Sequence, residues 1–114
     1  KEFTQVIQLL QLVEYDDVFY NLVSRTFLLA SYYELEEYDS LEALINSTNI
    51  YLRRSKGISE KQQRQYLSQN RFLKKLMNIN QNDKNAIEKL KAQLSETTGV
   101  ASKPWLAEKI NELL

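Results

Sequence analysis

Basic and tyrosine side chains carry most of the binding chemistry that this sequence offers. Arginine and lysine bind carboxylates and phosphates through charge-assisted hydrogen bonds, and tyrosine adds a large apolar ring with a hydroxyl at a small entropic cost. Together, side chains of these two kinds would suit an acidic protein or peptide. The candidate partner-binding residues are Arg53, Arg54, Arg64, Arg71, Lys75, Tyr15, Tyr20 and Tyr33.

Charge is strongly ordered along the chain, although the formal net charge is zero. Residues 1–52 contain two basic and nine acidic side chains, and residues 53–75 contain eight basic and one acidic side chain. The remaining residues contain five of each. A net charge of −7 is therefore followed by one of +7, so the chain is a strong dipole in sequence.

The basic segment has two explanations. At helical spacing, Arg64, Arg71 and Lys75 project from nearly the same side, and they could hold an acidic peptide, a phosphate or a nucleic-acid backbone. Alternatively, cations near a helix C-terminus, such as Arg53 and Arg54, complement the helix dipole, and acidic and basic segments attract each other within the fold. The second explanation is the more common one, because an amphipathic helix needs a charged outer face in any case.

The seven tyrosines also allow two interpretations. They could line a groove that grips a peptide, or they could pack between helices with their hydroxyls at the rim. We expect packing for Tyr32, Tyr38, Tyr51 and Tyr66. The groove candidates are Tyr15, Tyr20 and Tyr33.

The sequence lacks the residues that most often carry out catalysis or bind metal ions. The chain has no cysteine and no histidine, which excludes disulfides, thiolate or imidazole metal ligands and a serine–histidine pair. The carboxylates of residues 34–39 are better explained by turn solvation and helix capping than by a metal site. Neither glycine lies in a phosphate-binding pattern. We therefore expect no enzyme, no cofactor and no metal, and a sequence pI of about 6.5 disfavours a dedicated nucleic-acid binder.

Composition predicts a single all-α domain over residues 1–114. The hydrophobic fraction of 43% and the charged fraction of 26% are ordinary for a folded protein. Only two glycines and one proline are present, which are too few turn-forming residues for a fold with many strands and tight turns. The apolar runs are far shorter than the roughly 20 residues that span a bilayer. With no signal-like segment and no cysteine, we expect a cytoplasmic location and no membrane partner.

About six antiparallel helices are predicted from apolar side chains at three- and four-residue spacing. Their expected ranges are 3–13, 17–35, 39–56, 59–79, 83–99 and 102–114. Helix starts are expected at Asp17, at Asp39 with Glu42, at Ser59 with Gln62, at Asp83 and at Ser102 with Pro104. Gly57 and Gly99 are expected to end the helices that precede them.

The second predicted helix, residues 17–35, has apolar side chains around most of its circumference. Leu22 and Leu29 lie on one side of it, Val23 and Phe27 on a second, and Leu28 on a third. A helix that is apolar nearly all round must be covered by several neighbours. This pattern favours stacked helical hairpins over an isolated pair of helices.

One hairpin resembles a tetratricopeptide repeat, a helix–turn–helix unit of about 34 residues. The resemblance rests on Leu28, Tyr32, Leu35 and Tyr38, followed by the Asp-Ser-Leu start of the next helix at residues 39–41. Tyr66 follows Tyr32 by 34 residues, which agrees with a second, degenerate unit. The match departs from the family at Leu29 and Glu36, where small residues or glycine are usual, and at Leu41, where alanine is usual. The resemblance implies hairpins stacked in a short right-handed superhelix.

A second resemblance covers more of the chain. The segments YYELEEYDSLEALI, NIYLRR, ISEKQQRQYLSQNRFLKKL and PWLAEKINEL are similar to the C-terminal part of long bacterial repeat-like proteins. This likeness, and a start at Lys1 with no methionine, implies the closing fragment of a longer repeat protein. It brings no activity with it.

The function that these features favour is a protein-interaction or scaffolding module without enzymatic activity, with an acidic protein or peptide as partner. Two alternatives stay open. The segment could be a structural cap of a solenoid with no partner of its own, or it could bind nucleic acid or phosphate weakly through the basic segment 53–75. The oligomeric state is left open.

Overall fold

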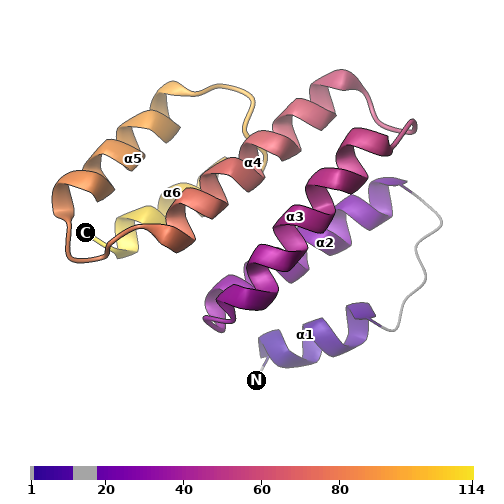
Figure 1. The fold of residues 1–114 in the computed structure, drawn as a ribbon, viewed down its shortest axis with the longest axis horizontal. Coiled ribbons are helices and arrows are strands. Elements are labelled where there is room, and N and C mark those ends of the chain that lie inside the picture. Colours follow the sequence, from indigo (N-terminus) through magenta and orange to yellow (C-terminus); the bar gives the residue numbers. More distant parts are fainter. Residues whose placement is uncertain (1, 12–17) are drawn as a thin grey trace. The chain divides into compact units, whose positions relative to one another are not determined.

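The computed structural model describes residues 2–11 and 18–114, and the side chains of all of these except residues 8–11. This part of the chain forms six α-helices and no strand, which confirms the all-α prediction (Figure 1). The helices are α1 (Glu2–Gln11), α2 (Val18–Glu34), α3 (Tyr38–Arg54), α4 (Glu60–Asn78), α5 (Lys84–Glu96) and α6 (Lys103–Glu112). The expected turn at residues 14–17 and the cap at Asp17 lie outside the described residues.

The chain divides into two compact units, residues 1–58 and residues 59–114. The first unit contains α1, α2 and α3, and the second contains α4, α5 and α6. One domain over the whole chain stays a prediction.

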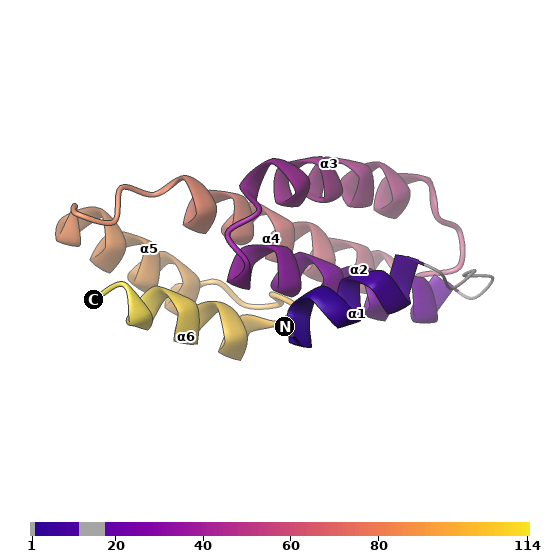
Figure 2. The same cartoon turned by 90° about the horizontal axis from the view of Figure 1, so that it is seen from below.

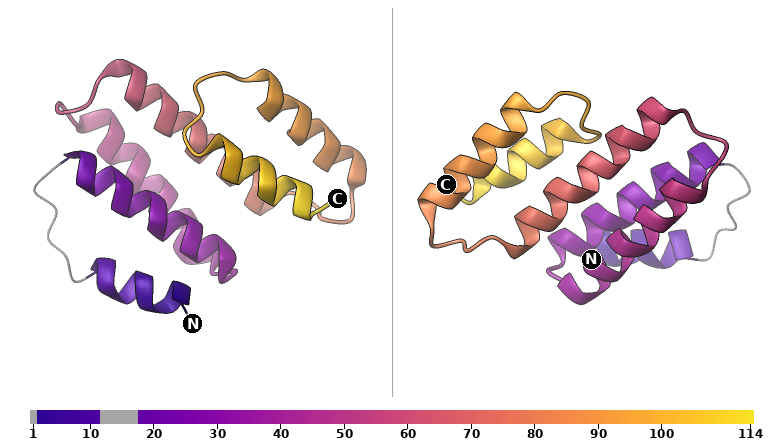
Figure 3. Two further views of the ribbon diagram at one scale, coloured as in Figure 1. Left: turned by 180° about the vertical axis from the view of Figure 1, so that it is seen from behind. Right: turned by 45° about the horizontal axis from the view of Figure 1, so that its top comes forward.

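In the first unit, α2 packs against both α1 and α3, and α2 and α3 run antiparallel as a hairpin (Figure 3). Helical spacing predicts that the inner face of α3 consists of Leu41, Leu44, Ile45, Thr48, Tyr51 and Leu52. This prediction is confirmed, because four of these side chains are buried and the other two, Leu44 and Tyr51, are half-buried. The buried apolar residues of this unit are Ile7, Leu22, Leu28, Leu29, Leu41, Ile45 and Leu52.

Arg25 joins α2 to α3. Its guanidinium donates a hydrogen bond to Asn21 Oδ1 on its own helix (2.7 Å) and two more to Ser47 Oγ (3.0 Å) and Thr48 Oγ1 (3.1 Å) on α3. The same group lies 4.8 Å from the centre of the Tyr51 ring, in cation–π geometry. The one cation between residues 18 and 52 is thus held against α3.

The hairpin turn closes α2 with a left-handed residue. Glu36 has a φ of 57°, its N–H donates to Tyr33 O (3.1 Å), and the Glu37 N–H donates to Tyr32 O (3.0 Å). This pair of bonds is a Schellman motif, in which glycine is usual at the left-handed position. Because the turn is so short, α3 starts at Tyr38 with Glu37 as its N-cap, without a side-chain capping bond. The expected capping box of Asp39 and Glu42 is therefore wrong, since Asp39 already lies inside the first turn.

Gly57 has a different role from the one expected. The helix α3 ends at Arg54 with Ser55 in an extended conformation. The helix α5 likewise ends at Glu96 with Thr97 extended, so the expected helix end at Gly99 is wrong too, although Gly99 has a positive φ in the loop that follows. A Cβ at Gly57 would lie 2.9 Å from Val18 Cγ2. Glycine is needed there because the chain passes close to the start of α2.

In the second unit, α4 packs against α5 and α6, and α5 and α6 pack against each other (Figure 2). The capping box of Ser59 and Gln62 is present, Asp83 caps α5 by accepting from Ala86 N (3.0 Å), and α6 starts after Ser102 with Pro104 in its first turn. These predictions are confirmed. The buried apolar residues are Phe72, Leu73, Leu76, Ile87, Leu90, Leu94, Leu106 and Ile110.

The core of the second unit includes a chain of polar side chains. The Ser102 hydroxyl donates to Gln69 Oε1 (2.6 Å), and Gln69 Nε2 donates to Asn70 Oδ1 (3.1 Å). Both amides are buried. The Ala101 N–H also donates to Gln65 O (3.0 Å), so the loop before α6 is fixed to α4 at two points.

We predict that Glu36→Gly stabilises the first unit by about 1 kcal/mol, because glycine adopts the left-handed conformation without the Cβ penalty. Urea unfolding followed by circular dichroism measures this. The matched control is Glu37→Gly, at a position with a φ of −88°. It should lower stability by about 0.5 kcal/mol, because it only adds freedom to the unfolded chain. Equal losses in both variants would contradict the assignment of strain to Glu36.

Candidate functional site

The predicted cations are divided between the two units. Arg53 and Arg54 are exposed in the last turn of α3, in the first unit. Arg64, Arg71 and Lys75 are exposed on α4, in the second unit. The last three lie together on one face of α4.

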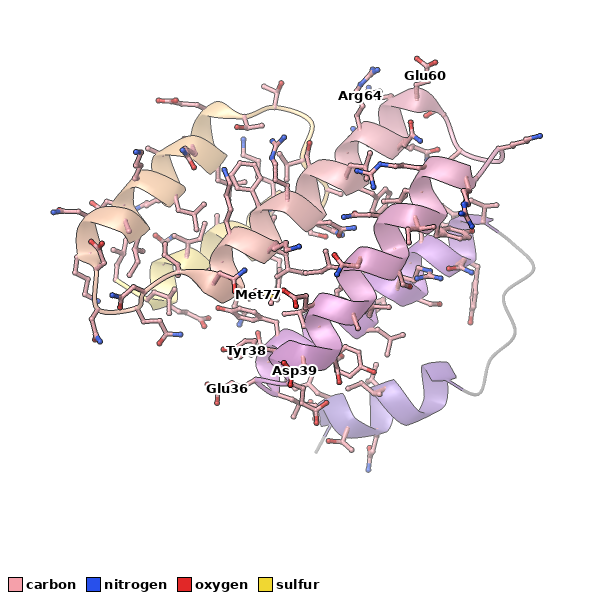
Figure 4. All side chains as sticks on the ribbon, viewed as in Figure 1. Glu36, Tyr38, Asp39, Glu60, Arg64 and Met77 are labelled. Carbon is pink, nitrogen blue, oxygen red and sulfur yellow. The ribbon has the colours of Figure 1, made fainter. Side chains whose placement is uncertain are left out.

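The cationic face of α4 consists of Lys61, Arg64, Arg71 and Lys75, all exposed. Their spacing of three, seven and four residues keeps them on one side of the helix. One carboxylate lies nearby, since Glu60 Oε2 is 3.9 Å from Arg64 Nη1 with both side chains well exposed (Figure 4). A contact of this kind contributes little.

Farther along α4, the cations contact an aromatic ring. The Arg71 guanidinium lies 5.4 Å and Lys75 Nζ 5.6 Å from the centre of the Phe72 ring. Within the described second unit, neither Arg71 nor Lys75 has a carboxylate within 4.0 Å. Within this unit, neutralisation by the fold's own carboxylates therefore does not account for these two charges.

The three tyrosines predicted to bind a partner differ in how far the structure exposes them. Tyr15 lies outside the described residues. Tyr33 is half-buried, and its ring makes an edge contact with Tyr38 at a centroid distance of 6.3 Å. Tyr20 is 51% exposed on α2. Tyr20 is thus the more exposed of the two, and the Tyr33 ring contacts Tyr38 inside the hairpin.

An aromatic face on α2 is the most unusual surface of the described chain. We define it as Phe19, Tyr20, Val23 and Phe27, which share one side of the helix. Phe19 is 63% exposed, Phe27 is 59% exposed and Val23 is half-buried. Single exposed apolar residues are normal on proteins, but a contiguous apolar patch marks a surface for association.

The expectation that neighbours enclose this helix from several directions is wrong at Phe27. Leu28 is buried as expected, with 8% exposure. In the first unit α2 packs against two helices, α1 and α3, and two neighbours cover only part of the circumference of a helix. The remaining sector carries the aromatic face.

This face is free of charge along its length. Between Val18 and Ser31, Arg25 is the one ionised side chain, and it is engaged with α3 as described above. The aromatic side chains Phe19, Tyr20 and Phe27 each carry roughly 150–250 Å² of surface. With half or more of each exposed, they present on the order of 300 Å² of mainly apolar area.

Carboxylates follow directly at the C-terminal end of the face. Glu34 lies seven residues after Phe27, on the same side of α2, and is half-buried. Glu36 and Asp39 are exposed in the turn and the start of α3 (Figure 4). Glu37 is exposed as well. We call these four residues the acidic turn.

Tyr38 begins α3 beside the acidic turn. The pKa of its hydroxyl is raised above the ordinary value of 10.0, first because burial disfavours the charged phenolate and second because the Glu36 carboxylate repels it.

Other types of site were also sought. The part of the chain that the structure describes contains no group of three or more acidic side chains placed to hold a metal ion. Within the same residues, no helix is long and apolar enough to cross a membrane. No family model, no curated protein and no solved structure matches this chain.

Sequence reasoning missed Phe19 and Phe27 as binding residues. The sequence does contain a pattern that could have identified them, because Phe19, Val23 and Phe27 recur at intervals of four residues and form one apolar stripe on the helix. The same spacing is typical of a core-facing stripe, and only the packing of α1 and α3 shows that this one is uncovered.

We predict that the free energy of unfolding falls as pH rises through about 10, partly because of Tyr38. The unfolded chain releases the phenolic proton near its ordinary pKa, whereas the folded chain holds it to a higher pH. The stabilisation is complete below the unfolded pKa and is lost above the folded one. Urea unfolding between pH 8 and 11 should show a smaller loss in Tyr38→Phe than in the parent. Equal slopes in Tyr38→Phe and the parent would contradict the prediction.

Proposed function

We propose that this chain is a non-enzymatic protein-interaction module that binds a helix of another protein on the aromatic face of α2. The observation that carries the proposal is the exposure of Phe19, Tyr20 and Phe27 on one side of a well-packed helix. Exposed aromatic side chains lower the solubility of a protein, and aromatic side chains are enriched at the centres of protein interfaces. The resemblance to a tetratricopeptide repeat supports the same class of function.

The shape of this surface supports a helical partner. Together with Ala30, which follows Phe27 on the same side of α2, the face spans roughly 17 Å at 1.5 Å per residue. That is about three turns, the length over which one amphipathic helix places its apolar residues against another. A scaffold role follows if the two units bind different partners.

The cationic face of α4 is a second candidate binding surface, for an acidic protein segment. It is supported by the exposure of Arg64, Arg71 and Lys75 and by the absence of carboxylates near the last two within the second unit. A phosphate backbone is the weaker alternative, because the chain as a whole has a pI of about 6.5.

We predict that the double variant Phe19→Ser/Phe27→Ser loses partner proteins at least about tenfold, because it removes the two largest apolar contacts. Affinity capture with the tagged parent chain, followed by quantitative mass spectrometry, identifies candidate partners. A candidate is accepted as a partner only if it binds the parent chain directly when both proteins are purified. The matched control is Ile50→Ser, which changes a side chain on α3 that is 51% exposed. Circular dichroism checks that all three proteins are folded. Partners retained by the double variant would overturn the proposal.

We predict that Arg64→Glu/Arg71→Glu weakens binding of an acidic partner by about tenfold at low salt and has a much smaller effect at 0.5 M NaCl, because the charges are exposed. Lys89→Glu/Lys91→Glu on α5 makes the same change in net charge on another helix and is the control. Gel shifts with generic RNA and DNA separate protein binding from phosphate binding. Equal effects of both double variants would show that only net charge matters.

A further inference from the structure

We infer that the helix bound by the aromatic face of α2 is the α2 helix of a second copy of this chain, in a weak dimer with a two-fold axis perpendicular to the helix. This inference rests on the proposed function and names the partner as another molecule of the same protein. Each copy presents the same four residues, Phe19, Tyr20, Val23 and Phe27, and the two helices run antiparallel.

The order of the largest side chains along this face is the same in both directions. Phe19 lies four residues before Val23 and Phe27 lies four residues after it, on one side of α2. In a two-fold dimer, residue i of one copy contacts residue j of the other, and j contacts i. With the axis near Val23, Phe19 of each copy lies opposite Phe27 of the other. The face is therefore complementary to itself.

The size of the side chains also suits a crossing at this point. Val23 is half-buried and is smaller than the exposed rings of Phe19 and Phe27 on either side of it. Side chains spaced four residues apart form ridges, and helices that pack through such ridges cross at roughly 50° with axes about 8–10 Å apart. A small residue at the crossing lets the two backbones approach, and the rings fill the space where the helices diverge.

The charge along this part of α2 permits two copies to meet. Arg25 is the one ionised side chain between Val18 and Ser31, and its guanidinium is held against α3 by hydrogen bonds. Pairing of residues 19–27 with the same residues of a second copy therefore brings no like charges together. The formal net charge of the whole chain is zero, a condition that promotes association.

The exposed area sets the strength of this dimer. The aromatic side chains present on the order of 300 Å² in each copy, so a dimer covers roughly 600 Å² of aromatic surface. Stable interfaces bury about 1,200–2,000 Å² in total, and smaller ones belong to weak or transient complexes. We therefore expect a dissociation constant on the order of 100 µM, so that the chain is monomeric when dilute and dimeric when concentrated.

Other occupants fit this face less well. Helices that lie on anionic membranes carry lysine and arginine beside their apolar face, whereas Arg25 is the one basic residue between positions 18 and 52. An unrelated helix would need an apolar face of about three turns without charge. The α2 helix of a second copy has these properties, and it is present at the same concentration as the face that it binds.

The first test measures the average mass of the full chain by sedimentation equilibrium, from about tenfold below to about tenfold above the expected dissociation constant. The mass should rise from 13.4 kDa toward twice that value. The variant Phe19→Ser/Phe27→Ser should raise the dissociation constant at least about tenfold. The matched control, Ile50→Ser, changes an exposed side chain on α3 and should keep the parent's value. Circular dichroism checks that all three proteins are folded.

Salt gives a second signature of this dimer. The first unit contains five basic and nine acidic side chains, a formal net charge of −4. Because the face itself is uncharged, screening of the repulsion between two such units should leave the dimer as strong or make it stronger. A dimer that is lost when NaCl is raised from 50 to 500 mM would be held by charge, and this result would overturn the inference.

Cross-linking tests the arrangement of the two helices, because the chain contains no cysteine. In the variant Val23→Cys one thiol lies near the axis, and a short bismaleimide should join two copies. Ile50→Cys on α3 is the control and should give little product. Phe27→Cys should not cross-link to itself but should cross-link to Phe19→Cys in an equimolar mixture. Cross-linking of Phe27→Cys to itself would show parallel helices and overturn the antiparallel dimer.

Failure of this inference and failure of the proposed function give different results. If the parent stays monomeric while a purified partner protein binds it and is lost in Phe19→Ser/Phe27→Ser, the inference fails alone. If this variant changes neither self-association nor partner binding, both fail. A dimer that persists in the variant uses another surface and overturns the inference. Binding to anionic vesicles that is lost in the variant, without a dimer of the parent, would replace the second copy with a lipid surface.

Discussion

The second helix has more apolar surface than its neighbours within the first unit can cover, and this imbalance determines the character of that unit. Leu22, Leu28 and Leu29 are buried, whereas Phe19 and Phe27 remain mostly exposed. In the first unit two helices, α1 and α3, pack against α2, and each neighbour covers one sector of the helix surface. The uncovered sector is where the unit differs from an ordinary helical hairpin.

Polar contacts fix how the helices pair, while apolar burial supplies most of the stabilisation. In the first unit, Arg25 bonds to two hydroxyls of α3 and stacks on Tyr51, which orients α3 along α2. In the second unit, Gln69 links Asn70 to Ser102 and so fixes the start of α6. Buried polar groups of this kind are costly when unpaired, so they favour one arrangement over similar ones.

The two units also differ in charge. Residues 1–58 contain five basic and nine acidic side chains, whereas residues 59–114 contain ten basic and six acidic ones. The first unit places an uncharged aromatic face next to carboxylates, and the second displays cations along α4. The two surfaces therefore differ in chemistry, since the face on α2 is apolar and the face on α4 is cationic.

Local signals in the sequence determined the helices and most of their ends. The spacing of Leu41, Ile45 and Leu52 predicted the inner face of α3, and the side chains of Ser59, Gln62 and Asp83 predicted two helix starts. These features depend on residues within a few positions of one another. A single sequence contains the information that such short-range interactions need.

Tertiary structure decided the features that depend on distant residues. Gly57 is required by its approach to Val18 and not by a helix end, and the left-handed Glu36 moved the start of α3 ahead of Asp39. The predicted cations were divided between two units, and Phe27 became a surface residue. The physical reason is that periodicity records which sides of a helix are apolar, whereas the number and position of the neighbouring helices decide which of those sides are buried.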